Sequence, residues 1–364
     1  MSDDTRISNV NSGIDYRKLG SWKAIMETIV LASLNFPDRW GLDFEVVRST
    51  VGKSAVIFRI GGMRFVLVLE GLGTKIEVAL AMQQLTGLLF YRFIAKDNVA
   101  MAVNDAAICG AKPLVYLDYA AVGNSSWFDD VERARDLGQG FLEACREAYV
   151  ALLGGESPAL PPMIFPHTID LAGAVLGVID NDLRWIKGDV QAGDDVIFIP
   201  SNGSICSNGI SPLRTLAERV PSGYLAEIGN GMTFGEAILQ PTPFIVDDVQ
   251  RLLDVARPHA IEPLTGGGFL KIARCRDPFT YVIKHVPELP PLHQFIMDRS
   301  GSSIENGFTT WNMGVLAAVI APKSETSTIL GAIKGSSLAG HVEEGPRQVV
   351  LEQYGHQVLK DENW

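Results

Sequence analysis

The stretch from Glu70 to Lys75, "EGLGTK", follows an apolar run and combines one carboxylate, two glycines and one lysine. Gly71 and Gly73 allow the backbone to approach a ligand closely, and backbone N–H groups in such a turn can face phosphate oxygens. The stretch lacks the spacer and the Gly-Lys-Ser/Thr ending of a P-loop. The residues alone favour a plain turn after a strand, and phosphate binding is the alternative.

Several polar side chains of the first half lie within otherwise apolar sequence: Asp97, Asn104, Asp105, Asp118 and Glu156. An isolated carboxylate in apolar surroundings is costly unless it is paired, protonated or bound to a metal. The set therefore indicates a Mg²⁺ and phosphate site, while helix capping is the alternative for Asp97 and Asp105. The loop "GGESPALPPM" holds Glu156 on a rigid segment of two glycines and three prolines, as functional loops often do.

The second half contains two loops of small residues, "SNGSICSNGIS" and "LTGGGF", each followed by a helical pattern. Helix N-termini with glycine and hydroxyl residues bind phosphate through free N–H groups and the helix dipole. An ordinary helix cap is the alternative for each loop. Two such loops in one half favour an anion site.

The histidines and cysteines do not indicate a metal site. The six histidines show no H-E-x-x-H spacing, and no G-x-S-x-G elbow accompanies them. His259 precedes the "LTGGGF" loop, where a hydrogen-bonded structural histidine is the more common role. The four cysteines form no C-x-x-C pair, which indicates reduced thiols.

Length and charge limit the classes of function. The chain has 364 residues, a net charge of -11 and a hydrophobic content of 47%, as expected for a folded globular protein. No overall positive field attracts nucleic acid or an anionic membrane. The polar, acidic start and the lack of an 18-residue apolar run predict a cytoplasmic protein with neither of these partners.

The candidate site residues lie within a sequence in which helix and strand patterns alternate. We expect a helix over residues 16–34 and a hairpin over residues 54–75 that leads into the glycine turn. Helices over residues 79–113 are expected to kink at the polar "KDN". A boundary at about residue 182 divides the chain into domains 1–182 and 183–364.

Nine blocks of the sequence occur in the order found in one enzyme family: "SGIDY", "EGLGTK", "DNVAMAVNDAAICGAKPLVYLDYAAVG", "GGESPALPPM", "DLAGAVLGV", "GDDVIFIPSNGSICSNGIS", "LQPTPFIV", "HAIEPLTGGGF" and "TTWNMGV". Together they resemble aminoimidazole ribonucleotide synthetase, also called phosphoribosylformylglycinamidine cyclo-ligase. The resemblance covers nearly the whole chain, from about residue 12. Many blocks in a fixed order are far more specific than any one of them.

The resemblance implies a two-domain α+β fold. Strands of the N-terminal domain would pair with a second subunit into a dimeric β-barrel, and this domain would bind ATP. The C-terminal α/β domain would be ferredoxin-like and would line the substrate cleft. A homodimer that uses ATP and Mg²⁺ on a small phosphoribosylated substrate is therefore expected.

The family reaction closes the imidazole ring of aminoimidazole ribonucleotide from formylglycinamidine ribonucleotide, with ATP converted to ADP and phosphate. An amide oxygen leaves poorly until it is phosphorylated. Phosphoryl transfer depends on metal, carboxylates and backbone N–H groups more than on a nucleophilic side chain. The resemblance therefore implies a purine-biosynthetic ligase.

Site residues also follow from the resemblance. The metal ligands would be Glu70, Asp105 and Glu156. The nucleotide site would comprise these acids with Gly71, Gly73, Thr74, Lys75, Asp97 and Asn104. The substrate site would comprise Ser207, Asn208, Gly209, Thr265, Gly266, Gly267 and Gly268. The catalytic side chains would be Lys75, Asp105, Cys206 and His259.

The sequence departs from the family pattern at several positions, three of which bear on the chemistry. Glu70 stands where the family has aspartate, and Cys206 and Pro263 each replace a histidine. A neutral thiol and a proline transfer protons poorly or not at all. Two other functions therefore remain open: a small-molecule kinase or dikinase of the same superfamily, and an ATP-binding paralogue that does not close the ring.

Overall fold

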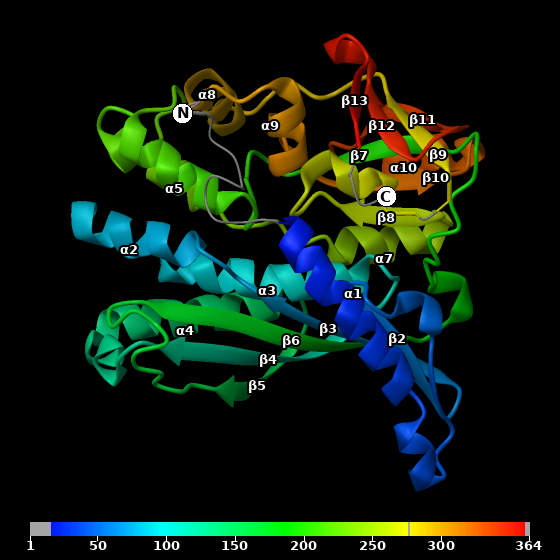
Figure 1. Cartoon of the computed structure of the whole chain (residues 1–364), viewed down its shortest axis with the longest axis horizontal. Helices are drawn as coiled ribbons and strands as arrows, with labels where there is room; N and C mark the ends of the chain where they lie inside the picture. The colour runs from blue at the N-terminus through cyan, green and yellow to red at the C-terminus, as the bar shows by residue number, and fades with distance from the viewer. Residues whose placement is uncertain (1–15, 276, 361–364) are drawn as a thin grey trace.

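The structure is a computed structural model that describes residues 16–275 and 277–360. Within these residues the chain forms two β-sheets, one from each half (Figure 1). The α+β fold expected from the sequence is confirmed. None of the described helices is long and apolar enough to cross a bilayer.

The first half forms a six-stranded sheet in the order β1-β2-β3-β6-β4-β5. Its strands are β1 (Phe44–Val46), β2 (Ala55–Ile60), β3 (Met63–Gly71), β4 (Lys112–Val122), β5 (Ala151–Glu156) and β6 (Ile169–Ile179). Its helices are α1 (Tyr16–Ser33), α2 (Lys75–Thr86), α3 (Tyr91–Ala107) and α4 (Val131–Glu147). The predicted first helix and the β2–β3 hairpin are confirmed.

The predicted kink at "KDN" is wrong, because α3 runs through residues 96–98 without a break. The helical segment breaks instead at Gly87, which caps α2 in the left-handed conformation at φ 74°. Glycine adopts this conformation without steric cost and commonly ends helices. The polar residues of α3 therefore all belong to one unbroken helix.

The second half forms a seven-stranded sheet in the order β13-β12-β9-β11-β7-β10-β8. Its strands are β7 (Asp195–Pro200), β8 (Ala260–Pro263), β9 (Phe279–Ile283), β10 (Val315–Ala321), β11 (Ser337–Glu344), β12 (Gln348–Leu351) and β13 (Gln357–Leu359). Its helices are α5 (Ile210–Arg219), α6 (Phe234–Ile238), α7 (Val246–Val255), α8 (Pro291–Ser300), α9 (Ile304–Thr310) and α10 (Thr326–Ala332). Every residue of β10 is buried, so this strand lies at the centre of the second core.

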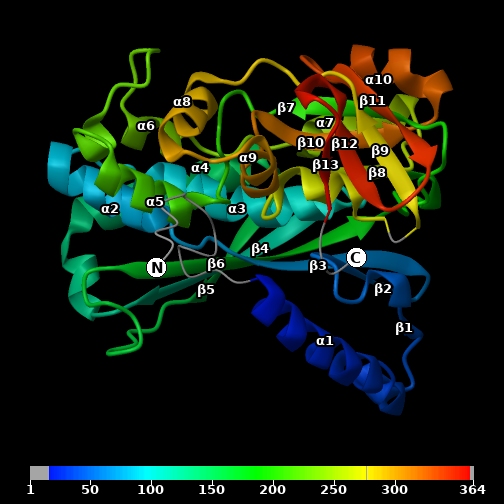
Figure 2. The same cartoon turned by 45° about the horizontal axis from the view of Figure 1, so that its top comes forward.

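The second half lies over the helices of the first half (Figures 1 and 2). Helix α2 contacts α5 and α6, while α3 contacts α7. Strand β6 ends at Ile179 and β7 begins at Asp195, so residue 182 falls in the connection between the sheets. The division into domains 1–182 and 183–364 stays a prediction.

The first sheet is covered on one face only. Val66 and Val68 of β3 are buried beneath the helices, whereas Leu67 and Leu69 on the other face are 48% and 72% exposed. Successive side chains of a strand point to opposite faces, so β3 presents a row of apolar side chains away from the helices. We call this uncovered face, which includes Leu67 and Leu69, the open face of the first sheet.

Candidate active site

A crevice of about 60 Å³ lies between the two halves, where the end of β3 and the middle of α3 meet loops of the second half. Its lining residues are Glu70, Met101, Asn104, Asp105, Cys206, Ser207, Asn208, Thr242, Ile245, Pro263, Leu264, Thr265 and Leu316. The crevice thus brings two predicted carboxylates together with residues from both predicted substrate loops.

The "EGLGTK" stretch connects β3 to α2. Gly71 ends the strand, Gly73 has φ 74°, and Thr74 precedes the first turn of α2. The Oγ1 atom of Thr74 lies 2.9 Å from the Oγ atom of Ser211 in α5. The stretch is therefore both a strand-to-helix turn and a contact between the two halves.

Lys75 is fully buried and forms an ion pair with Asp97, at 2.6 Å between Nζ and Oδ2. Its ammonium also donates to the carbonyl oxygens of Cys206 and Gln240, each at 2.9 Å. These contacts use all three donors of the ammonium group. Lys75 thus joins the two halves of the molecule, and its expected role in phosphate binding stays a prediction.

The polar side chains of α3 bind the backbone of the second half. Oδ1 of Asp97 accepts hydrogen bonds from N and Oγ1 of Thr242, at 2.8 and 2.6 Å. Asn104 donates to the carbonyl of Pro243 and accepts from the amide of Ile245. Asp97 and Asp105 lie inside α3 rather than at its N-terminus, so the helix-cap alternative is wrong for both.

Glu70 and Asp105 face each other in the crevice. Burial raises the pKa of Glu70 to about 7, with a further contribution from the negative charge of Asp105. Burial also raises the pKa of Asp105, although a hydrogen bond with Ser54 opposes this rise. Each of the two carboxyl groups therefore keeps its proton to a higher pH than an exposed carboxyl group does, unless a further cation binds beside it.

Two cations that the sequence did not single out oppose these acids. Lys271 and Arg274, in the short helix η7 (Gly268–Ala273) and directly after it, lower the pKa values of Glu70 and Asp105 by their charge. Arg274 also donates to Oγ of Ser54 at 3.3 Å. The two basic residues follow the triple glycine in sequence, a signal that could have identified them.

Raising the pH is expected to destabilise the protein through Glu70. Its folded-state pKa of about 7 lies above the ordinary 4.5, so the folded protein binds the proton more tightly than the unfolded chain. The stabilisation is fully present below pH 4.5 and is lost as pH rises through 7. We expect the free energy of unfolding in urea to fall by about 2 kcal/mol between pH 5.5 and 8.5.

The Glu70→Gln variant is expected to lose part of this pH dependence. Glu132, an exposed residue of α4, offers a matched Glu132→Gln control that should behave like the wild type. Equal pH dependence in the wild type and in Glu70→Gln would contradict the proposed titration.

Cys206 and His259, the two side chains expected to transfer protons, lie in different places. The Cys206 thiol lines the crevice, but burial raises its pKa to about 11, so it is neutral at pH 7. Nδ1 of His259 lies 2.7 Å from Oδ2 of Asp194, and His259 lies at the opposite end of β8 from Pro263. His259 does not line the crevice; its geometry is that of a structural hydrogen bond.

The predicted substrate loops converge on the crevice. Ser207, Asn208 and Thr265 line it, and the buried Oγ of Ser207 has no hydrogen-bond partner among the described residues. A buried hydroxyl without a partner is costly, so this atom is available to a ligand.

The glycines of the two loops adopt positive φ. Gly209, Gly267 and Gly268 have φ of 69°, 95° and 54°. Gly266 completes the second loop.

Glu156 is exposed at the end of β5. Strands β6 and β4 separate β5 from β3, which corresponds to about 14 Å at ordinary strand spacing. The described residues contain no group of three His, Cys, Asp or Glu side chains placed to hold a metal. The structure therefore unites Glu70 with Asp105 but not with Glu156, and the three-carboxylate magnesium site stays a prediction.

Comparison with known proteins places the chain among close relatives of one enzyme. The family model "AIR synthase related protein, N-terminal domain" matches residues 52–179. Phosphoribosylformylglycinamidine cyclo-ligase of Alkaliphilus oremlandii is 32% identical over 293 residues, which cover 78% of this chain and 82% of that enzyme. The same enzyme of Methanobrevibacter smithii is 30% identical, with coverage of 85% and 88%.

Solved structures support the fold. The complex of AaThiL with AMPPCP and TMP superposes with a TM-score of 0.59 at 15% identity and covers 82% of this chain and 87% of that chain. At this identity the likeness concerns the fold alone. It agrees with the two-sheet arrangement described above.

Proposed function

The chain belongs to the family of AIR synthase-related proteins that includes phosphoribosylformylglycinamidine cyclo-ligase, and we propose that it is an ATP-dependent cyclo-ligase of purine biosynthesis. It would convert formylglycinamidine ribonucleotide to aminoimidazole ribonucleotide in the cytoplasm. One observation carries the proposal: the half-buried Glu70 and the buried Asp105 meet the two small-residue loops in a single crevice.

The acid pair suits a magnesium ion bound with nucleotide phosphates. Carboxylate oxygens are the ligands that Mg²⁺ prefers, and the raised pKa values of Glu70 and Asp105 reflect burial that the charges of Lys271 and Arg274 offset only in part. Mg²⁺, when bound, would neutralise phosphate charge during transfer. Lys271 and Arg274 would hold phosphate oxygens on the side of the second half, beside the two acids.

The loops of the second half would hold the amide substrate. The free Oγ of Ser207, with the side chains of Asn208 and Thr265, supplies hydrogen-bonding groups to the crevice. Backbone N–H groups of the triple-glycine loop would orient the substrate beside the acids. The substrate-binding roles expected for these residues are thus part of the proposal.

A second candidate function is ATP binding without ring closure. No histidine is among the described residues that line the crevice, Pro263 carries no titratable group, and the Cys206 thiol is neutral at pH 7. Ring closure needs a group that accepts a proton from the attacking nitrogen. In the leading proposal, a carboxylate of the Glu70 and Asp105 pair serves this purpose.

A direct assay separates the two candidates. Purified protein is incubated with formylglycinamidine ribonucleotide, ATP and Mg²⁺, and ADP and the imidazole product are quantified together. Equal amounts of both products support the cyclo-ligase. Nucleotide binding in a calorimetric titration, with neither ADP nor imidazole formed, supports the second candidate and contradicts the first.

We also propose that two copies of the chain associate through the open face of the first sheet, as the dimeric barrel requires. Leu117 on β4 and Leu69 on β3 both flank Ala174 of β6, so they form an apolar row across three strands. Trp22 and Ile25 of α1 are also exposed, and Figure 2 shows α1 on the side of the sheet away from α2 and α3. Exposed apolar patches of this kind mark association surfaces.

Replacing Leu69 with aspartate is expected to yield a monomer. A charge in the centre of an apolar interface must be desolvated without a partner, which costs several kcal/mol of association free energy. Sedimentation velocity of the wild type and the variant measures this change. Val255, exposed at the end of α7, provides the control Val255→Asp, and an unchanged dimer in Leu69→Asp would refute the assignment of this face.

A further inference from the structure

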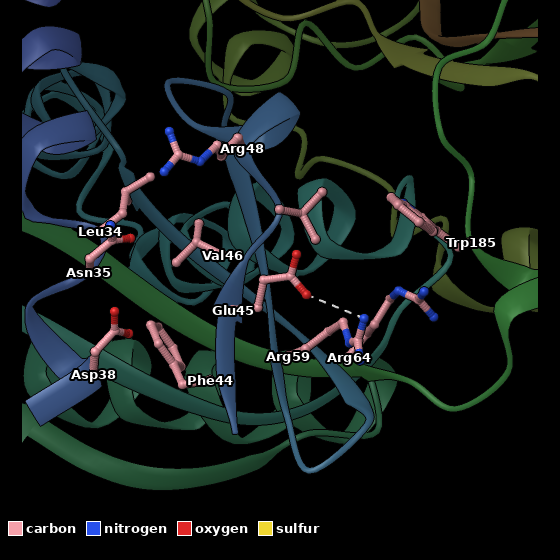
Figure 3. Close-up of a pocket in the computed structure, with 11 residues that line it drawn as sticks. Leu34, Asn35, Asp38, Phe44, Glu45, Val46, Arg48, Arg59, Arg64 and Trp185 are labelled. Atoms are coloured by element: carbon pink, nitrogen blue, oxygen red, sulfur yellow. Dashed lines mark ion pairs between the residues drawn. The ribbon is translucent and has the colours of Figure 1, made fainter. Parts of the chain in front are cut away.

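A second, larger cavity lies away from the crevice. It has a volume of about 630 Å³ and is bounded by the segment after α1, by β1, by the β2–β3 hairpin and by Trp185 of the connection between the sheets (Figure 3). It shares no lining residue with the crevice. Arg64 and Glu70 lie near opposite ends of β3, about 20 Å apart at the ordinary rise of a strand.

Three arginines line this cavity: Arg48, Arg59 and Arg64, against the two carboxylates Asp38 and Glu45. The lining residues thus carry one more positive than negative charge, in a chain whose net charge is -11, and Asp182 outside the lining pairs with Arg64. Arginine presents a planar fork of donors that matches phosphate and carboxylate groups. The cavity therefore differs in charge from the protein as a whole.

Two of the three guanidinium groups are available to a ligand. Arg48 is exposed, and its side chain makes no hydrogen bond or ion pair within residues 16–275 and 277–360. Arg59 pairs with Glu45 at 3.3 Å, but these side chains are 39% and 65% exposed. Such surface pairs contribute little stability, so a ligand anion can replace Glu45 at little cost.

Arg64 defines one wall of the cavity. It pairs with Asp182, and its guanidinium carbon lies 4.7 Å from the centre of the Trp185 ring. In Figure 3, Arg64 and Trp185 stand together on one side of the cavity. These contacts fix the wall, which leaves Arg48 and Arg59 as the groups that adapt to a ligand.

The opposite side of the cavity is partly apolar. Leu34, Phe44 and Val46 line it, and Figure 3 shows Leu34 and Phe44 across from Trp185. The volume falls in the range of small-molecule sites. The cavity thus offers both a cationic side and a surface for an apolar or ring-shaped group.

We propose that this cavity binds a small organic anion, a phosphate or carboxylate group joined to a ring or apolar body. Arg48 and Arg59 bind the anionic group through paired N–H donors, and Glu45 is displaced from Arg59. The body of the ligand packs against Phe44 and Val46. This site is separate from the crevice proposed for ATP and substrate, and its occupant is a second ligand.

Titration calorimetry with phenyl phosphate and benzoate tests the site. Inorganic phosphate, which lacks the ring, and phenol, which lacks the anionic group, serve as partial probes. We expect phenyl phosphate or benzoate to bind more tightly than either partial probe. The double variant Arg48→Gln and Arg59→Gln should weaken this binding at least 10-fold, and Arg48→Lys should weaken it less. The preferred probe identifies the phosphate or carboxylate class.

Two control variants distinguish this cavity from other anion sites. Arg251→Gln, at an exposed position of α7, and Lys271→Gln, whose charge acts on Glu70 of the crevice, should bind the probe as the wild type does. The proposal is overturned if the double variant binds as tightly as the wild type. It is also overturned if Lys271→Gln abolishes binding, or if the organic anion binds no more tightly than inorganic phosphate.

Discussion

Replacing Lys75 with methionine lowers the free energy of unfolding by about 3–5 kcal/mol, the largest stability change expected for this protein. The substitution keeps the length of the side chain but leaves Asp97 as a buried charge without a counter-ion. It also leaves the carbonyls of Cys206 and Gln240 without their donor. Urea unfolding, monitored by tryptophan fluorescence, measures the loss.

The double variant Lys75→Met and Asp97→Asn is expected to recover part of this loss, because it removes the unpaired charge as well. Lys96 supplies the matched control. It lies on the same helix as Asp97 but pairs only with surface acids, at 3.8 Å from Glu143. Lys96→Met should change stability by less than about 1 kcal/mol, and an equally small effect of Lys75→Met would contradict the role assigned to the buried pair.

Replacing Asp105 with asparagine reduces kcat/KM for the ATP-dependent reaction by at least about 100-fold, or roughly 2.7 kcal/mol of transition-state stabilisation. Asparagine has nearly the same shape but lacks the charge that would bind Mg²⁺ beside Glu70. Because burial raises the pKa of Asp105, the neutral amide should not lower the free energy of unfolding. Activity and stability are therefore expected to separate in this variant.

The measurement combines steady-state assays of product formation with urea unfolding of the same preparations. Asp129→Asn, at an exposed position before α4, serves as a control that should retain wild-type turnover. Wild-type kcat/KM in Asp105→Asn would remove this carboxylate from the proposed mechanism. A loss of activity that accompanies a loss of stability would assign Asp105 a structural role instead.

Local features of the molecule were predicted well from the sequence. Two β-branched apolar runs around "GGMR" predicted the hairpin of β2 and β3, and the glycines of "EGLGTK" predicted the turn that follows. These features depend on interactions between residues close together in the chain. Positive φ at Gly73, for example, is a property of the turn itself.

Contacts between the halves were not predictable in the same way. Lys75 has the residue type and position of a phosphate ligand, yet its ammonium binds Asp97 and two carbonyls of the second half. Lys271 was not singled out from the sequence, but its charge acts on the acids of the crevice. Its place after the triple glycine is a local signal, whereas its distance from the acids depends on how the halves pack together.

The sequence by itself determined the elements, the small-residue loops and the family of this protein. Only the tertiary structure decided which charged groups meet. The packing of α3 on β3 brings Asp105 toward Glu70, whereas the strand order β3-β6-β4-β5 places Glu156 three strands away. Side-chain alternation and turns arise from neighbouring residues, whereas the distance between two carboxylates far apart in the chain is set by strand order and domain packing.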